Sequence, residues 1–230
     1  MYVRKLKCMV VLISTFAVCY IYYFLNEQSW SWYLHSAEKN SRCQTPIEEM
    51  RDLIQLTRDT HIILDSNNLT HFPIYGSLFG ALRYKDPLPW DTDVDLFLRA
   101  EELDNIDEDK LLSDFKAKGI KILYRPWFGA YRITRGRSRG DLMIFKNYSG
   151  TMNRVGIESY AFFVNYRKHH IFPAHLIEKP LPTLKFCGIK MFAPRGGIEL
   201  QKYHYRNDWW LEKKPNGCYN ASEYKKLKKE

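Results

Sequence analysis

Three aspartates spaced two residues apart constrain this chain more than any other feature. Asp91, Asp93 and Asp95 lead into the large apolar residues 96–98, a composition typical of a buried β-strand. Strand side chains alternate between two faces, so the three carboxylates would point the same way. Neighbouring like charges repel, and a fold tolerates them mainly when a cation lies between them. Because Mg²⁺ and Mn²⁺ prefer carboxylate oxygens and share them with substrate phosphates, the spacing predicts a metal-dependent site for a phosphorylated substrate.

Two other interpretations of the aspartates are weaker. A solvated acidic surface does not explain the apolar residues that flank them. An EF-hand calcium loop would use the three aspartates and Glu102, but it needs a glycine where this chain has Leu96. Pro87 and Pro89 also prevent a helix from leading directly into such a loop. A site for metal and substrate is therefore the preferred interpretation.

The residues before and around the aspartates resemble the signature of a known family. They read Gly76-Ser-Leu-Phe-Gly-Ala-Leu-Arg83, then Tyr84-Lys85, then Pro89-Trp-Asp-Thr-Asp-Val-Asp95. This pattern is similar to that of the LicD family, which includes bacterial phosphocholine transferases and the animal fukutin and fukutin-related proteins. Ser77 departs from it, because the family more often has Thr there, but both residues supply a hydroxyl. A weaker similarity in residues 180–209 extends the resemblance to roughly residues 46–212.

The resemblance implies a nucleotidyltransferase-type fold, an α+β domain with a mixed sheet flanked by helices. In that fold a turn at Gly76 and Ser77 holds the nucleotide phosphates, and the aspartates follow on the next strand. A further carboxylate comes from a later strand. Asp141, at the head of the apolar run 142–145, matches that place. The alternative for Asp141, which follows a glycine, is an ordinary turn residue.

The predicted chemistry follows from charge. Phosphoryl transfer requires positioning and neutralisation of phosphate charge more than covalent work by the protein. Two Mg²⁺ or Mn²⁺ ions held by Asp93, Asp95 and Asp141 would clamp the attacking and leaving oxygens. Asp91 is either a further metal ligand or the general base for the acceptor hydroxyl, and the sequence leaves both roles open.

Basic residues suggest contacts with anions. The net charge is +9, and arginines gather between residues 125 and 139. Arg83 and Lys85 are candidate phosphate contacts, with a solvated basic surface as the alternative. Because a secretory location argues against nucleic acid, we expect the arginine cluster to meet anionic small molecules or glycans.

By the resemblance, the chain would be an enzyme that moves a phospho-alcohol unit, such as phosphocholine or ribitol phosphate, from a CDP-linked donor to a glycan hydroxyl. CMP would be released. The short stem and small domain leave little room for an elaborate acceptor site, so we expect a protein partner to help. One alternative is a Golgi glycosyltransferase that uses a nucleotide sugar, although such enzymes place a longer α/β half before their Asp-x-Asp. The other alternative is an inactive glycan-binding relative, which the intact set of aspartates disfavours.

The N-terminal residues suggest a membrane anchor. Residues 1–7 are basic and precede an uncharged run, residues 8–25, which would span about 27 Å as a helix. The expected organisation is therefore a cytosolic tail, a single transmembrane signal-anchor and a lumenal domain in the Golgi or endoplasmic reticulum. A cleaved signal peptide is the alternative. A stem (26–44), the catalytic domain (45–212) and a basic tail (213–230) would follow.

Lumenal exposure would allow two covalent modifications. Acceptor triplets for N-glycosylation begin at Asn68, Asn147 and Asn220. Outside the predicted anchor there are three cysteines, so at most one disulfide forms within the chain. We expect it to join Cys187 and Cys218.

Periodicity and capping signals predict the order of helices and strands. A helix opens with Thr45 as the cap and Pro46 at its first position, and it stops at Asn67. Further helices are expected near residues 107–118 and 197–204. The expected strands cover residues 69–75, 93–98, 120–124, 129–134, 142–145, 161–166 and 185–192.

Overall fold

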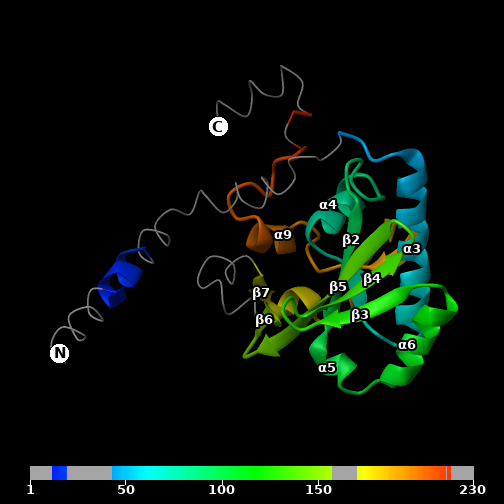
Figure 1. Ribbon diagram of the computed structural model, residues 1–230, viewed down its shortest axis with the longest axis horizontal. Coiled ribbons are helices and arrows are strands. Elements are labelled where there is room, and N and C mark those ends of the chain that lie inside the picture. Colours follow the sequence, from blue (N-terminus) through cyan, green and yellow to red (C-terminus); the bar gives the residue numbers. More distant parts are fainter. Residues whose placement is uncertain (1–11, 20–42, 157–169, 216, 219–230) are drawn as a thin grey trace. The chain divides into compact units, whose positions relative to one another are not determined.

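A computed structural model describes residues 12–19, 43–156, 170–215 and 217–218 (Figure 1). The chain divides into two compact units, residues 1–40 and 41–230, and the fold below is that of the second unit. The expected strand at residues 161–166 lies outside the described residues, as do the predicted cytosolic tail and most of the stem.

The predicted transmembrane helix is not supported. Of the segment 8–25, residues 12–19 are described, and they are helical. No helix among the described residues is long and apolar enough to cross a bilayer. The prediction of a single-pass type II protein of the Golgi or endoplasmic reticulum membrane is therefore wrong.

The second unit is built around one mixed sheet, which confirms the α+β class. The strand order is β1-β2-β5-β4-β3, and β6 extends the sheet from β5 to β7. Only the β2–β5 pair is parallel among the described strands of this sheet, and the others are antiparallel. The strands are β1 (His71–Pro73), β2 (Asp93–Arg99), β3 (Lys121–Arg125), β4 (Ala130–Arg135), β5 (Ser138–Tyr148), β6 (Thr151–Arg154) and β7 (Ile171–Pro173). A separate hairpin pairs β8 (Thr183–Phe186) with β9 (Ile189–Phe192).

Helices accompany the sheet, and α3 runs alongside it (Figure 1). They are α3 (Ile47–Ser66), α4 (Tyr75–Arg83), α5 (Ala100–Leu103), α6 (Glu108–Ala117), the 3₁₀ turn η1 (Ala174–Ile177) and α9 (Glu199–His204). Helix α3 stops before its C-cap Asn67, as predicted, but Pro46 is its N-cap and there is no side-chain cap. Thr45 instead bonds to the loop before β2, because its Oγ1 donates to Asp91 O at 2.7 Å.

Alternation along the central strands divides the core in two. Val94, Leu96 and Leu98 of β2 pack with α3 and α6 in one cluster, whereas Phe97 belongs to the cluster that contains residues of α4 and α9. Asp93 and Asp95 share the strand face of Phe97 because side chains on a strand alternate. The acidic residues therefore lie on the α4 and α9 side of the sheet, away from α3.

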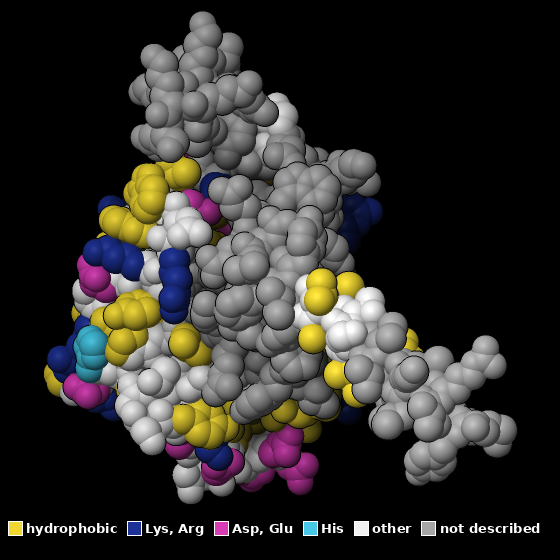
Figure 2. All heavy atoms as spheres, turned by 90° about the vertical axis from the view of Figure 1, so that its left-hand side faces the viewer, with side chains coloured by type: hydrophobic (Ala, Val, Ile, Leu, Met, Phe, Trp, Pro, Cys, Tyr) yellow, Lys and Arg dark blue, Asp and Glu magenta, His cyan; other side chains and the backbone are white. Residues whose placement is uncertain are grey.

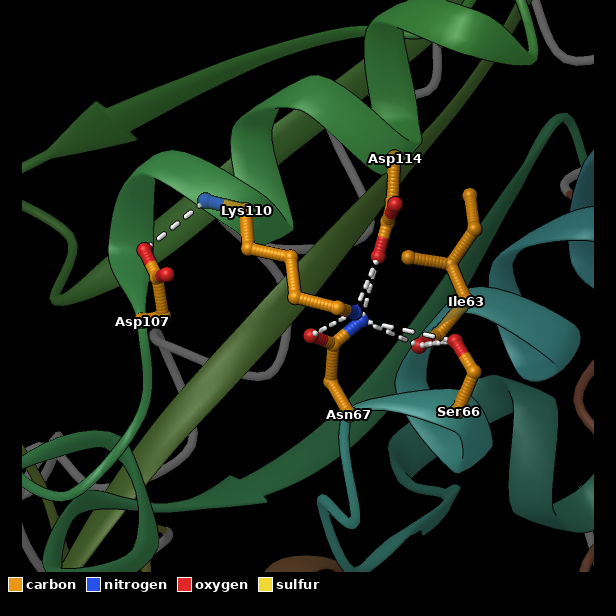
Figure 3. Close-up of polar contacts among 6 residues, drawn as sticks. All are labelled: Ile63, Ser66, Asn67, Asp107, Lys110 and Asp114. Atoms are coloured by element: carbon orange, nitrogen blue, oxygen red, sulfur yellow. Dashed lines mark hydrogen bonds and ion pairs between the residues drawn. The ribbon is translucent and has the colours of Figure 1, made fainter.

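A polar cluster joins the end of α3 to α6 (Figure 3). Asn67 Nδ2 donates to Asp114 Oδ2 at 2.8 Å, and Lys110 Nζ donates to Asn67 Oδ1 at 2.9 Å. Asp107 caps α6 by accepting a hydrogen bond from the backbone N–H of Lys110. These contacts lie away from the aspartates of β2, and they fix how α6 docks on α3.

The disulfide differs from the prediction. Cys43 is bonded to Cys218, and Cys187 is a free, fully buried thiol. Burial raises the pKa of Cys187 to about 12, so the thiol is neutral. The pairing of Cys187 with Cys218 was wrong because Cys187 follows β8 into the core beside α3, where Cys218 does not reach.

Two of the three glycosylation triplets can be located. Asn68 and Asn147 are exposed, while Asn220 lies outside the described residues. Thr70, the third residue of the first triplet, is buried and its hydroxyl donates to Glu102. Modification of these sites stays a prediction.

Candidate active site

The predicted Gly-Ser turn is the first turn of a helix. Strand β1 ends at Pro73, two residues before α4 begins at Tyr75, so the expected strand at residues 69–75 is shorter than predicted. Helix α4 has no side-chain cap at Ile74. The N–H groups of a first helical turn point outward, and the helix dipole favours an anion there. Gly76 and Ser77 thus supply backbone donors of the kind that hold phosphate.

Gly76 lies directly beside Asp91. A Cβ built on Gly76 would lie 3.9 Å and 4.0 Å from the two carboxylate oxygens of Asp91. Glycine here keeps the space between the helix start and the carboxylate open. The sequence prediction that these two residues belong to one site is consistent with this spacing.

The Ser77 hydroxyl connects helix α4 to strand β2. Its Oγ accepts a hydrogen bond from the backbone N–H of Asp95 at 2.9 Å, and Ser77 is only 3% exposed. The hydroxyl therefore ties α4 to β2 and holds Asp95 at the start of the helix. The backbone N–H of Ser77 is the predicted phosphate donor.

Tyr75, at the start of α4, has an unusual backbone. Its φ is +54°, which is a costly conformation for a bulky residue. Gln201, which is fully buried, donates from Nε2 to Tyr75 O at 2.7 Å. The Tyr75 hydroxyl bonds to His170 Nδ1 at 2.5 Å, and its ring packs on His204. These contacts hold the conformation that turns the chain from β1 into α4.

Four carboxylates come together at the beginning of β2 and β5. In the parallel pairing of these strands, Asp95 lies opposite Asp141, and Asp93 lies opposite Arg139. Asp91 precedes β2, where its Oδ2 accepts a hydrogen bond from Leu88 N at 3.2 Å. Asp141 is therefore not an isolated turn residue: it lies within β5, next to the other acidic residues.

Burial and mutual repulsion perturb these acids. Burial raises the pKa of Asp95 well above the ordinary carboxyl value, and the charges of Asp93 and Asp141 raise it further. Burial also raises the pKa of Asp93, although Arg139, whose Nε lies 3.5 Å from Asp93 Oδ2, opposes the shift. Such perturbed acids gathered beside a helix N-terminus are typical of functional sites.

The donor chemistry of this site fits a hard divalent cation, but the side chains are not arranged around one. Carboxylate oxygens are the ligands that Mg²⁺ and Mn²⁺ prefer, and a bound cation would relieve the repulsion at Asp95. Within the described part of the chain, no three His, Cys, Asp or Glu side chains are grouped so as to hold an ion. The carboxylate of Asp141 is turned instead to Arg132, which donates from Nε and Nη2 at 2.5 Å and 2.6 Å.

The contacts of Arg83 and Lys85 described below do not involve the carboxylates. Both lie at the C-terminal end of α4, opposite the end that carries Gly76. Arg83 donates to Leu211 O at 3.1 Å and lies over the ring of Phe79. Lys85 is exposed, and its carbonyl accepts a hydrogen bond from the Cys187 N–H. Arg83 therefore anchors the segment after α9, which the sequence motif did not indicate.

The arginine cluster of the sequence divides between two faces of the sheet. Arg132 and Arg139 contact the carboxylates, whereas Arg135 bonds to Asp59 of α3 at 2.6 Å.

The roles of Thr45 and Gln201 were missed from the sequence, because their partners lie 46 and 126 residues away in the chain. No local pattern signals such contacts.

Comparison with known proteins agrees with this geometry. Residues 68–196 match the family described as LicD/FKTN/FKRP, nucleotidyltransferase domain. The chain belongs to the LicD family. The match includes α4, β2 and β5, and therefore every carboxylate of the candidate site.

Individual relatives are more distant. An uncharacterized protein of Rickettsia prowazekii, RP689, is 24% identical over 188 residues, which cover 82% of this chain and 66% of that protein. The ribitol 5-phosphate transferase FKRP of Mus musculus is 27% identical over 159 residues, covering 65% of this chain and 30% of that protein. The chain thus spans two thirds or less of the curated relatives it matches.

Proposed function

We propose that this LicD-family chain is a phosphotransferase that moves a phospho-alcohol unit from a CDP-linked donor to a glycan hydroxyl. Phosphocholine and ribitol phosphate are the candidate units. The observation that carries the proposal is the placement of the first turn of α4 beside the carboxylates, with Gly76 against Asp91. Membership in a nucleotidyltransferase-domain family and similarity to a protein named as a ribitol 5-phosphate transferase support it.

In this proposal the first turn of α4 binds a donor phosphate. Backbone N–H groups at Gly76 and Ser77 donate to the phosphate oxygens, and the absence of a side chain at Gly76 lets them approach. The hydrogen bond from Asp95 N to Ser77 Oγ keeps the phosphate and the carboxylates in register. Positioning of this kind accounts for much of the catalysis of phosphoryl transfer.

Asp93, Asp95 and Asp141 are the residues that would hold Mg²⁺ or Mn²⁺. A bound ion would neutralise charge on the phosphate oxygens of the donor. The acceptor oxygen forms its bond to phosphorus as the bond to CMP breaks, and the acceptor proton is lost. Asp91, beside Gly76, either takes that proton as a general base or serves as a further ligand.

Other parts of the proposal concern partners. The face in Figure 2 mixes basic, acidic and hydrophobic side chains on its described surface, with no continuous basic stripe there. We propose a small anionic donor rather than nucleic acid as the ligand, because Arg132 and Arg139 of the arginine cluster contact the carboxylates of the site. A protein partner for acceptor binding remains part of the proposal, and co-purification would test it.

Calorimetric binding to the purified full chain tests the function. We expect CDP-choline or CDP-ribitol to bind in the presence of Mn²⁺, and to lose binding in Asp93→Asn/Asp95→Asn. Asp52→Asn, an exposed carboxylate on α3, is the matched control and should bind as the wild type does. Metal-dependent binding of UDP-sugars instead would indicate a glycosyltransferase. A folded protein that binds none of these would refute the proposal and favour an inactive relative.

A further inference from the structure

Arg132 holds the one carboxylate of the site that comes from β5. In the antiparallel pairing of β4 with β5, Arg132 lies directly opposite Asp141. Its fork engages both oxygens of that carboxylate, from Nε to Oδ1 at 2.5 Å and from Nη2 to Oδ2 at 2.6 Å. The side chains are 29% and 13% exposed, so water screens this pair less than it screens a surface ion pair.

The charge of Arg132 acts on the whole site. Asp93 and Asp95 lie close enough to add to the effect of Asp141, and together they raise the pKa of Arg132, so this guanidinium is always charged. Ala130, two residues earlier on β4, packs in the core cluster on the α4 and α9 side. Ile133, the next residue, packs in the cluster on the α3 side. Arg132 therefore shares the face of the carboxylates.

Arg135 provides a natural comparison. It lies three residues further along β4, on the opposite face, where its Nη1 donates to Asp59 Oδ2 at 2.6 Å. Its side chain is 28% exposed and that of Asp59 is 10% exposed, values close to those of the Arg132 pair. The two ion pairs thus share a strand and residue types, and their burial is similar. They differ in that Arg132 donates from two nitrogens and Arg135 from one, and in that further carboxylates surround the Arg132 pair.

We propose that Arg132 is a positioning residue that occupies Asp141 until a divalent cation takes its place. The inference rests on the proposed function, because it assumes that the carboxylates bind Mg²⁺ or Mn²⁺. Both oxygens of Asp141 accept from one fork, which places a positive charge against this carboxylate, so a cation and the guanidinium compete for Asp141. The released guanidinium remains beside the site, where it can bind a donor phosphate bidentately.

This exchange has a definite sign. A positive charge close to a cation site weakens cation binding, and removal of that charge strengthens it. Arg132→Gln is therefore expected to bind Mn²⁺ more tightly than the wild type, by roughly threefold to tenfold at low ionic strength. Arg132→Lys keeps the charge but loses the fork, so its affinity for Mn²⁺ should lie between the two. Arg135→Gln should bind Mn²⁺ as the wild type does.

The test is Mn²⁺ binding to the purified full chain, followed by calorimetry and by thermal unfolding with and without Mn²⁺. Without metal, Arg132→Gln should unfold at a lower temperature than the wild type, because Asp141 loses its counter-ion next to Asp95. Mn²⁺ should then raise the unfolding temperature more in Arg132→Gln than in the wild type, because a ligand stabilises the state that it binds. The thermal comparison keeps the test usable if Arg132→Gln is only partly stable.

The outcomes separate this inference from the proposed function. Equal Mn²⁺ affinity in the wild type, Arg132→Gln and Arg135→Gln would overturn the exchange and leave the metal site intact. Weaker binding in Arg132→Gln would also overturn it and would mean that Arg132 orients Asp141 toward the ion. If neither the wild type nor Arg132→Gln binds Mn²⁺, both the exchange and the metal part of the proposed function fail.

Discussion

Replacing Ser77 by alanine tests whether its hydroxyl holds the strand or the substrate. Ser77 Oγ accepts a hydrogen bond from Asp95 N, in a position that is 3% exposed. The alanine variant leaves that buried N–H without its acceptor, which costs about 1–3 kcal/mol. For a domain of this size, the unfolding temperature should fall by roughly 2–4 °C for each kcal/mol lost.

The assay is urea unfolding of the full chain beside Mn²⁺ binding. The midpoint should fall while the slope with denaturant is unchanged, since the surface exposed on unfolding is the same. Because the hydrogen bond positions Asp95, Mn²⁺ binding should weaken as well. Ser77→Thr, which has the residue more common in the LicD family, keeps the acceptor oxygen and should lose less than about 1 kcal/mol.

Ser66→Ala is the matched control. Ser66 Oγ donates to Ile63 O at the exposed end of α3, where water can replace the hydroxyl, so the variant should lose little stability. The reasoning would be refuted if Ser77→Ala unfolded at the wild-type denaturant concentration and yet lost binding of the CDP-linked donor. The hydroxyl would then contact the substrate rather than hold the strand.

Three further predictions concern charge, the disulfide and a helix cap. Without divalent metal, the free energy of unfolding should fall as the pH rises from about 4 toward the raised pKa of Asp95, because the folded chain keeps a proton on Asp95 that the unfolded chain has lost. Urea titrations at several pH values measure this dependence, and Asp95→Asn should flatten it. Cys43→Ser/Cys218→Ser should lower the free energy of unfolding, measured with denaturant, by about 3–5 kcal/mol, because the disulfide closes a loop of 175 residues. If reduction of the wild type left its stability unchanged, that result would contradict the disulfide. Asp107→Ala removes the acceptor that caps α6 and should lower the unfolding free energy by about 1 kcal/mol, with Mn²⁺ binding unchanged.

Much of the site was predictable because its signals are local. Alternation placed Asp93 and Asp95 on one face of β2, and the apolar run after Asp141 predicted the strand that carries it. The Gly-Ser pair was given the wrong geometry, because Gly76 and Ser77 lie in the first turn of a helix rather than in a turn between elements. The transmembrane prediction from the uncharged residues 8–25 is not supported, because no helix among the described residues is long and apolar enough to cross a bilayer.

The amino-acid sequence alone determined the family, the α+β class and which carboxylates gather, since these follow from side-chain period and short-range motifs. Only the tertiary structure decided which partners those groups have. Arg132 meets Asp141 because two strands pair in a particular register, and Cys43 meets Cys218 across 175 residues of chain. The sequence does not show that Arg132 and Arg135, both on β4, have different partners. The packing of the sheet assigns one to the carboxylate site and the other to α3, because strand alternation places their side chains on opposite faces.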